Sequence, residues 1–142
     1  MDHVDPARSE RQRLKALLAE HGIQPTAQRV RVAEVLFCRD QHLTAEQVIH
    51  ALGRNGSHVS KATVYNTLNL FAGKGLLKAL SLDRECCRFD SNTRPHHHIH
   101  VEGTGELIDV PPGSVEFSRL PPLPAGAEQV SVEVVVRVRR PG

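Results

Sequence analysis

The spacing of apolar residues changes near the middle of this chain, and this change most restricts the folds available to it. In the first half, apolar residues recur at helical intervals in residues 11–21, 26–37 and 44–52. In the second half, apolar and polar residues alternate as they do in strands, most clearly from Val130 to Arg139. A block of helices followed by a β-rich block predicts an α+β protein.

Helix start signals divide the first half into segments. Thr26 is the expected N-cap of a second helix, Thr44 with Gln47 matches a capping box for a third, and Ser60 is the expected N-cap of a fourth. Strands are predicted over residues 76–82 and up to Asp90, with a turn at residues 83–85. Helices followed by such a hairpin follow the order of a winged helix-turn-helix domain.

The second half predicts a small sheet. An extended segment at residues 96–101 places His96, His98 and His100 on one face, and residues 106–110 form its expected partner. The prolines leave room for a short helix at residues 114–120 before the alternating strand. Such a strand needs a covered face, which a sheet shared across a homodimer would supply. We expect domains at residues 1–90 and 96–142, with a linker at residues 91–95.

Composition narrows the class of protein. The formal net charge is only +2, so any affinity for DNA has to come from local clusters of basic residues. We find neither a membrane-spanning apolar run nor a signal-peptide pattern, and expect a cytoplasmic protein with no membrane partner. Cys38, Cys86 and Cys87 lack zinc-site spacing, and we assign them no function.

The fourth helix has the chemistry of a DNA-reading surface. Its apolar face contains Val64, Leu68 and Phe71, and the opposite face can present polar groups to base edges in the major groove. The expected base-reading residues are Ala62, Tyr65, Asn66 and Asn69. The expected phosphate contacts are Arg29, Arg31, Lys61, Lys74 and Arg84. The partner implied is double-stranded DNA, although a polar helix face that is merely solvated has a similar pattern.

The histidine run points to metal chemistry. His96, His97 and His98 are consecutive, His100 follows, and Asp90 precedes them. Imidazoles suit Fe²⁺, Mn²⁺, Zn²⁺ and haem iron, and a nearby carboxylate shifts the preference toward the harder divalent ions. A solvated histidine tract that binds metal only adventitiously is the competing interpretation.

Several motifs together resemble the ferric uptake regulator family. They are Pro25-Thr26-Ala27-Gln28-Arg29, His42-Leu43-Thr44-Ala45-Glu46, Ala62-Thr63-Val64-Tyr65-Asn66-Thr67-Leu68, and Phe89-Asp90 before the histidines. Within that family, Asn66, the missing C-x-x-C pairs and the histidine run are similar to the iron response regulator branch. The resemblance implies a winged helix, a C-terminal α/β dimerisation domain and a homodimer on palindromic operators, regulated by iron or haem.

The resemblance also implies where the signal binds. The matching positions for a sensing site between the domains are His42, Asp90, His96 and His98. A second family site would use His97 and Glu116, but Pro95 replaces one of its histidines and Glu133 is a substitute for another. Haem would have to bind through His96, His97 or His98, since the Cys-Pro haem motif of some branch members is absent.

Two other functions fit the same residues. Two histidines and a carboxylate also describe the iron site of non-haem oxygenases, which would make the protein an enzyme. A peroxide sensor on the same fold would use bound iron to oxidise a ligand histidine. The first half of the chain favours a DNA-binding regulator over an enzyme.

Overall fold

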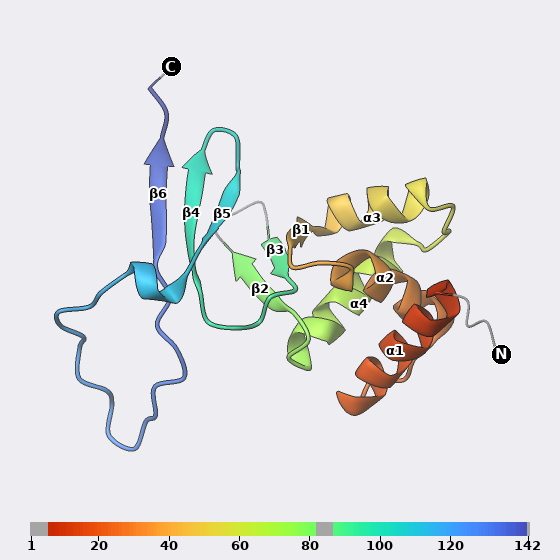
Figure 1. Ribbon diagram of the computed structural model, residues 1–142, viewed down its shortest axis with the longest axis horizontal. Helices are drawn as coiled ribbons and strands as arrows, with labels where there is room; N and C mark the ends of the chain where they lie inside the picture. Colours follow the sequence, from red (N-terminus) through yellow and green to blue (C-terminus); the bar gives the residue numbers. More distant parts are fainter. Residues whose placement is uncertain (1–5, 82–86, 142) are drawn as a thin grey trace. The chain divides into compact units, whose positions relative to one another are not determined.

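The computed structural model of the chain describes residues 6–81 and 87–141 (Figure 1). It forms two compact units, Met1–Thr93 and Arg94–Gly142. The expected turn at residues 83–85, which includes Arg84, lies outside the described residues. No helix among the described residues is both long enough and apolar enough to cross a membrane.

Four helices make up most of the described part of the first unit. They are α1 (Pro6–Glu20), α2 (Ala27–Phe37), α3 (Ala45–Arg54) and α4 (Lys61–Gly73). Thr26 and Ser60 cap α2 and α4 by accepting backbone N–H groups, and Thr44 and Gln47 form the complete capping box of α3. The three predicted helix starts are confirmed, because a cap depends only on residues three apart along the chain. Helix α1 begins before the expected residue 11.

The core of this unit lies under one face of α4. Val64, Leu68 and Phe71 are fully buried there and pack in one cluster with residues of the other helices, such as Leu14 and Leu36. Burying this face leaves Tyr65, Asn66 and Asn69 on the exposed side of the same helix.

The described residues of the first unit also form a three-stranded sheet. Strand β3 (Cys87–Asp90) lies between β1 (His42–Thr44) and β2 (Lys78–Ser81), antiparallel to both. The β2–β3 pair corresponds to the expected hairpin, whereas β1 is an addition that the sequence pattern did not predict. Its consequence is a cross-strand pair, because His42 in β1 lies opposite Asp90 in β3.

The second unit is built on a sheet of β4 (His97–Glu102), β5 (Leu107–Val110) and β6 (Val135–Arg139). Figure 1 shows β4 between its two neighbours, antiparallel to β5 and parallel to β6. Gly103 and Gly105 turn the chain from β4 into β5 with φ values of 94° and 74°, which favour glycine. This turn fixes the register that places Asp109 opposite His98.

The last strand is shorter than its sequence pattern predicts. We expected it to begin at Val130, but β6 begins at Val135. A segment of alternating apolar and polar residues forms a strand only where a partner strand accepts its hydrogen bonds. The pairing of β6 with β4 begins at His98 and Val135. The backbone N–H of Val134 instead donates to Nδ1 of His97 at 2.9 Å, and Val130 is 95% exposed.

The expected helix at residues 114–120 is also wrong. The only helical turn there is a 3₁₀ turn, η1 (Pro112–Ser114), after which Val115 is extended. Residues 116–120 are exposed, so a helix at this position would have no apolar surface to pack against. Short helices without such packing are unstable in water.

Candidate metal site and nucleic-acid interface

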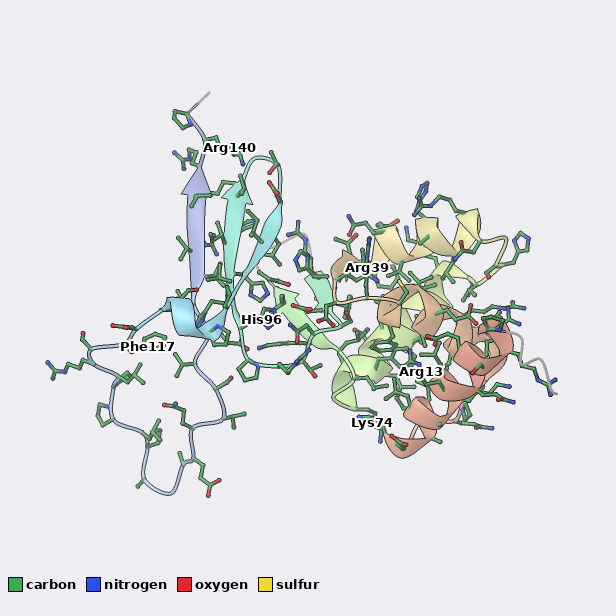
Figure 2. The ribbon with its side chains drawn as sticks, viewed as in Figure 1. Arg13, Arg39, Lys74, His96, Phe117 and Arg140 are labelled. Atoms are coloured by element: carbon green, nitrogen blue, oxygen red, sulfur yellow. The ribbon has the colours of Figure 1, made fainter. Side chains whose placement is uncertain are left out.

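Three potential metal ligands meet at one end of the second unit's sheet. His96 lies immediately before β4, where Figure 2 labels it, and His98 and Asp109 face each other across β4 and β5. Nε2 of His96 and Nε2 of His98 lie 3.5 and 3.3 Å from Oδ1 of Asp109. One ligand atom from each of the three residues lies within 4.8 Å of the others, as a single bound ion requires.

The ring of His96 is oriented for coordination. Its Nδ1 lies 2.6 Å from the carbonyl oxygen of Arg94, and because a carbonyl only accepts, Nδ1 carries the proton. In the neutral ring, Nε2 then carries the lone pair beside Oδ1 of Asp109, and the two atoms can serve together as ligands of one cation. A histidine that donates its other N–H to a carbonyl is the usual arrangement around a protein metal ion. The donor set therefore fits a cation.

Burial makes this cluster distinct from a solvated histidine tract. His96 and His98 are 5% and 1% exposed, while the side chain of Asp109 is 42% exposed and gives the cluster an open side. The rings of His96 and His98 lie with their centroids 4.4 Å apart. All the donors are nitrogen or oxygen, which favours Fe²⁺ or Mn²⁺ over thiolate-preferring metals.

His97 has different surroundings. Its Nδ1 accepts the N–H of Val134, and its ring meets Phe117 edge-on at 6.0 Å between centroids. Phe117 lies on the connection that follows η1 (Figure 2). In a neutral His97 the proton is therefore on Nε2, which lowers its capacity to bind a metal there. Among the described residues, the ligand cluster includes neither His97 nor the exposed Glu116.

The remaining expected ligands lie in the first unit. His42 and Asp90 are cross-strand neighbours of β1 and β3. Asp90 is fully buried, and its Oδ1 accepts the backbone N–H of Asn92 at 2.9 Å. A buried carboxylate requires compensation by hydrogen bonds or positive charge. Asp109 was missed in the sequence, although an acidic residue between Ile108 and Val110 in a short apolar strand was a usable signal.

The exposed side of α4 is the candidate nucleic-acid interface. Lys61, Ala62, Tyr65, Asn66 and Asn69 are all exposed, as base-reading and phosphate-contacting groups have to be. Arg29 is half-buried at the start of α2, where its Nη1 donates to the carbonyl of Gln24. Arg29 and Asn66 line one hollow of about 270 Å³ between α2 and α4. Arg31 and Lys74 are exposed elsewhere on the unit.

One acidic residue joins two members of this surface. Oε1 of Glu46, in the first turn of α3, accepts from the Tyr65 hydroxyl at 3.0 Å and pairs with Nζ of Lys61 at 3.1 Å. The bond to Lys61, followed by that to Tyr65, lowers the pKa of the Glu46 carboxyl, and the same pairing raises the pKa of Lys61. Glu46 is not among the DNA-contacting residues expected from the sequence.

Comparison with known proteins places these features in one family. The model of the ferric uptake regulator family matches residues 20–132. The peroxide-responsive repressor PerR of Staphylococcus aureus is 36% identical over 94 residues, which are 66% of this chain and 64% of that protein. The chain thus matches slightly less than two thirds of the relative's length.

Solved structures agree with the fold. The ferric uptake regulator of Pseudomonas aeruginosa, solved with manganese, is 26% identical with a TM-score of 0.69, over 89% of this chain and 96% of that one. The regulator of Francisella tularensis, solved with iron, has a TM-score of 0.68 at 24% identity, over 84% and 92% of the two chains. The expected α+β fold, a winged helix-turn-helix domain and a small α/β domain, is confirmed, and the chain belongs to the ferric uptake regulator family.

Proposed function

We propose that this protein is a transcriptional repressor that binds palindromic double-stranded DNA as a homodimer when a divalent metal ion is bound. The observation that carries the proposal is the cluster of His96, His98 and Asp109, in which Nε2 of each histidine lies within 3.5 Å of the carboxylate. Family members are transcription regulators, so the alternative of a non-haem iron enzyme is not supported.

The proposed sensing site adds His42 and Asp90 to this cluster. The two residues are paired across β1 and β3, and Asp90 is separated from His96 only by the short segment between the units. An ion bound by residues of both units would link them and so restrain this segment. Held in this way, the two units of each protomer would be restricted in the arrangements that they can adopt on DNA.

The second unit offers a surface for the homodimer. Ile99, Ile108 and Val136 are cross-strand neighbours on one face of the sheet, and Ile108 and Val136 are 39% and 45% exposed. An apolar row of this kind across three strands is costly to leave in water. It supports self-association, which a two-fold operator requires.

The direct test is a DNA-binding titration. Metal-free protein is compared with protein loaded with Mn²⁺, Fe²⁺ under anaerobic conditions, or Zn²⁺, on a duplex that the loaded protein selects from a randomised pool. We expect Mn²⁺ or Fe²⁺ to increase affinity roughly 10- to 100-fold, the usual size of coupling between two sites. Equal affinity with and without metal would overturn the proposal.

Peroxide is the second candidate signal, and the name of the Staphylococcus aureus relative favours it. Iron bound to imidazoles could direct hydrogen peroxide at a ligand ring, where one oxygen atom adds to the histidine and the other leaves as water. We expect peptides containing His42 or His96–His98 to gain one oxygen in iron-loaded protein treated with peroxide, measured by mass spectrometry. Manganese-loaded protein is the control. Equal oxidation of the iron-loaded and manganese-loaded proteins would count against peroxide sensing.

Haem is the signal implied by the resemblance to the iron response regulator branch. It would bind through His96, His97 or His98, whose exposures are 5%, 4% and 1%. A porphyrin is much larger than an ion, so reaching these rings requires this part of the sheet to open. We therefore favour a divalent metal over haem as the resident group, and include haem as one arm of the titration.

A further inference from the structure

Glu46 is an acidic side chain on a surface that has to approach DNA phosphates. Its side chain is 62% exposed and pairs with Lys61, which is itself 66% exposed. Exposed ion pairs of this kind contribute little to folding stability, because water screens both charges. The first turn of α3 favours a carboxylate through the helix dipole, but that preference would be met equally without the contacts to Lys61 and Tyr65.

The position of Lys61 does not favour folding. It is the first residue of α4, where the positive end of the helix dipole disfavours a cation. A cation here is well placed to bind a phosphate, together with the N–H groups of the helix start. In the structure, a carboxylate oxygen of Glu46 already forms an ion pair with this ammonium group.

The same oxygen also holds Tyr65. The hydroxyl of Tyr65 donates to Oε1 of Glu46 at 3.0 Å, so one atom restrains both the expected phosphate contact and the expected base contact. A glutamate carboxyl is ionised at neutral pH, and the bonds to Lys61 and Tyr65 lower the pKa of Glu46 further. Any DNA that binds through Lys61 has to replace this internal anion.

On the basis of the proposed function, we infer that Glu46 is a specificity-determining residue that competes with DNA phosphate for Lys61 and aligns Tyr65 for base reading. The competition lowers affinity for all DNA by a similar factor, whereas the alignment of Tyr65 raises affinity for operator DNA alone. Binding to unrelated sequence depends almost entirely on phosphate contacts and gains nothing from this alignment. Glu46 thereby widens the gap between operator and non-operator affinity.

The test uses Glu46→Gln in the full-length, manganese-loaded protein. The substitution frees Lys61 and replaces the charge-assisted bond to Tyr65 by a weaker neutral one, so the gain for operator DNA is offset by poorer alignment of Tyr65. We expect affinity for a random duplex to increase about fivefold and affinity for the selected operator less than about twofold. The logarithm of the binding constant for the random duplex falls linearly with the logarithm of the salt concentration, and this slope should become steeper by up to about 0.9.

Glu10→Gln is the matched control. Glu10 also forms an exposed ion pair, with Arg13 at 2.6 Å on α1, where Figure 2 labels the arginine. Its removal changes the net charge equally but leaves Lys61 and Tyr65 untouched. An equal gain in Glu10→Gln, or no gain in Glu46→Gln, would overturn the inference. The Glu46→Gln gain should also disappear in a Lys61→Gln background.

A spectroscopic measurement tests the contact without DNA. Tyr65 is the only tyrosine and the chain has no tryptophan, so intrinsic fluorescence reports on this side chain alone. An ionised carboxylate bonded to a phenol quenches its emission, and we expect Glu46→Gln to be brighter than the parent protein and Glu10→Gln to be unchanged. Equal emission from all three would overturn the inference. A parent protein that does not prefer its selected operator would instead overturn the proposed function.

Discussion

Replacing His98 by glutamine will lower affinity for Mn²⁺ by more than about 100-fold and remove the metal-dependent part of operator binding. His98 is 1% exposed and its Nε2 lies 3.3 Å from Oδ1 of Asp109, and a glutamine in its place would lack the imidazole nitrogen that binds the ion. Metal affinity is measured by competition with a calibrated chelator, and DNA binding by fluorescence anisotropy with and without Mn²⁺.

Two further variants separate coordination from folding. Asp109→Asn keeps the size of a partly exposed side chain and is expected to weaken Mn²⁺ binding about 10- to 100-fold with little change in thermal stability. His58→Ala removes an exposed imidazole in the first unit and should change neither property. If His98→Gln and Asp109→Asn both retain the metal affinity of the parent protein, the assigned site is wrong.

Replacing Tyr65 by alanine will reduce affinity for the selected operator about 10- to 100-fold, because a good contact to a base is worth roughly 1–3 kcal/mol of discrimination. Tyr65 is 40% exposed on the outer face of α4, and the core depends on the opposite face. Affinity for a random duplex should change less than about twofold. Anisotropy titrations of both duplexes at one salt concentration measure the ratio.

A phosphate-contact variant provides the comparison for Tyr65→Ala. Lys74 is exposed just beyond the end of α4, and Lys74→Gln is expected to lower affinity for operator and random duplex by the same factor. Circular dichroism should be unchanged for both variants. If Tyr65→Ala loses affinity equally on the two duplexes, the helix contacts the backbone and does not read sequence.

The helical half of the protein could be predicted because its signals are local. The caps at Thr26, Thr44 and Ser60 each depend on neighbours three residues away, and the buried stripe of α4 follows from helical spacing. The expected reading face of α4 and the orientation of its polar residues needed no information from elsewhere in the chain.

The β-rich half was less predictable because strands depend on partners that are distant in sequence. The valine alternation from Val130 predicts a strand, yet β6 extends only as far as β4 supplies hydrogen bonds. Strand β1 contains too few residues to show a period, and it forms only because β3 has an available edge. The short helix predicted after Ser114 failed for lack of a packing surface.

The candidate metal site shows the same division. His96, His98, Asp90 and His42 were selected from the sequence and its family resemblance, whereas Asp109 was not. Its place opposite His98 depends on the β4–β5 register, which the turn through Gly103 and Gly105 sets. The protonation of His96 likewise depends on the backbone carbonyl of Arg94, a contact of the folded chain.

The order of residues alone determined that this chain has a capped helical half with one polar helix face, followed by a histidine-bearing β half. Tertiary structure decided which donors converge, that Asp109 joins His96 and His98, and that Glu46 holds both Lys61 and Tyr65. The physical reason is the range of the interactions. Caps and amphipathic periods act within one or two helical turns, but cross-strand register and contacts between helices act between residues that only folding brings together.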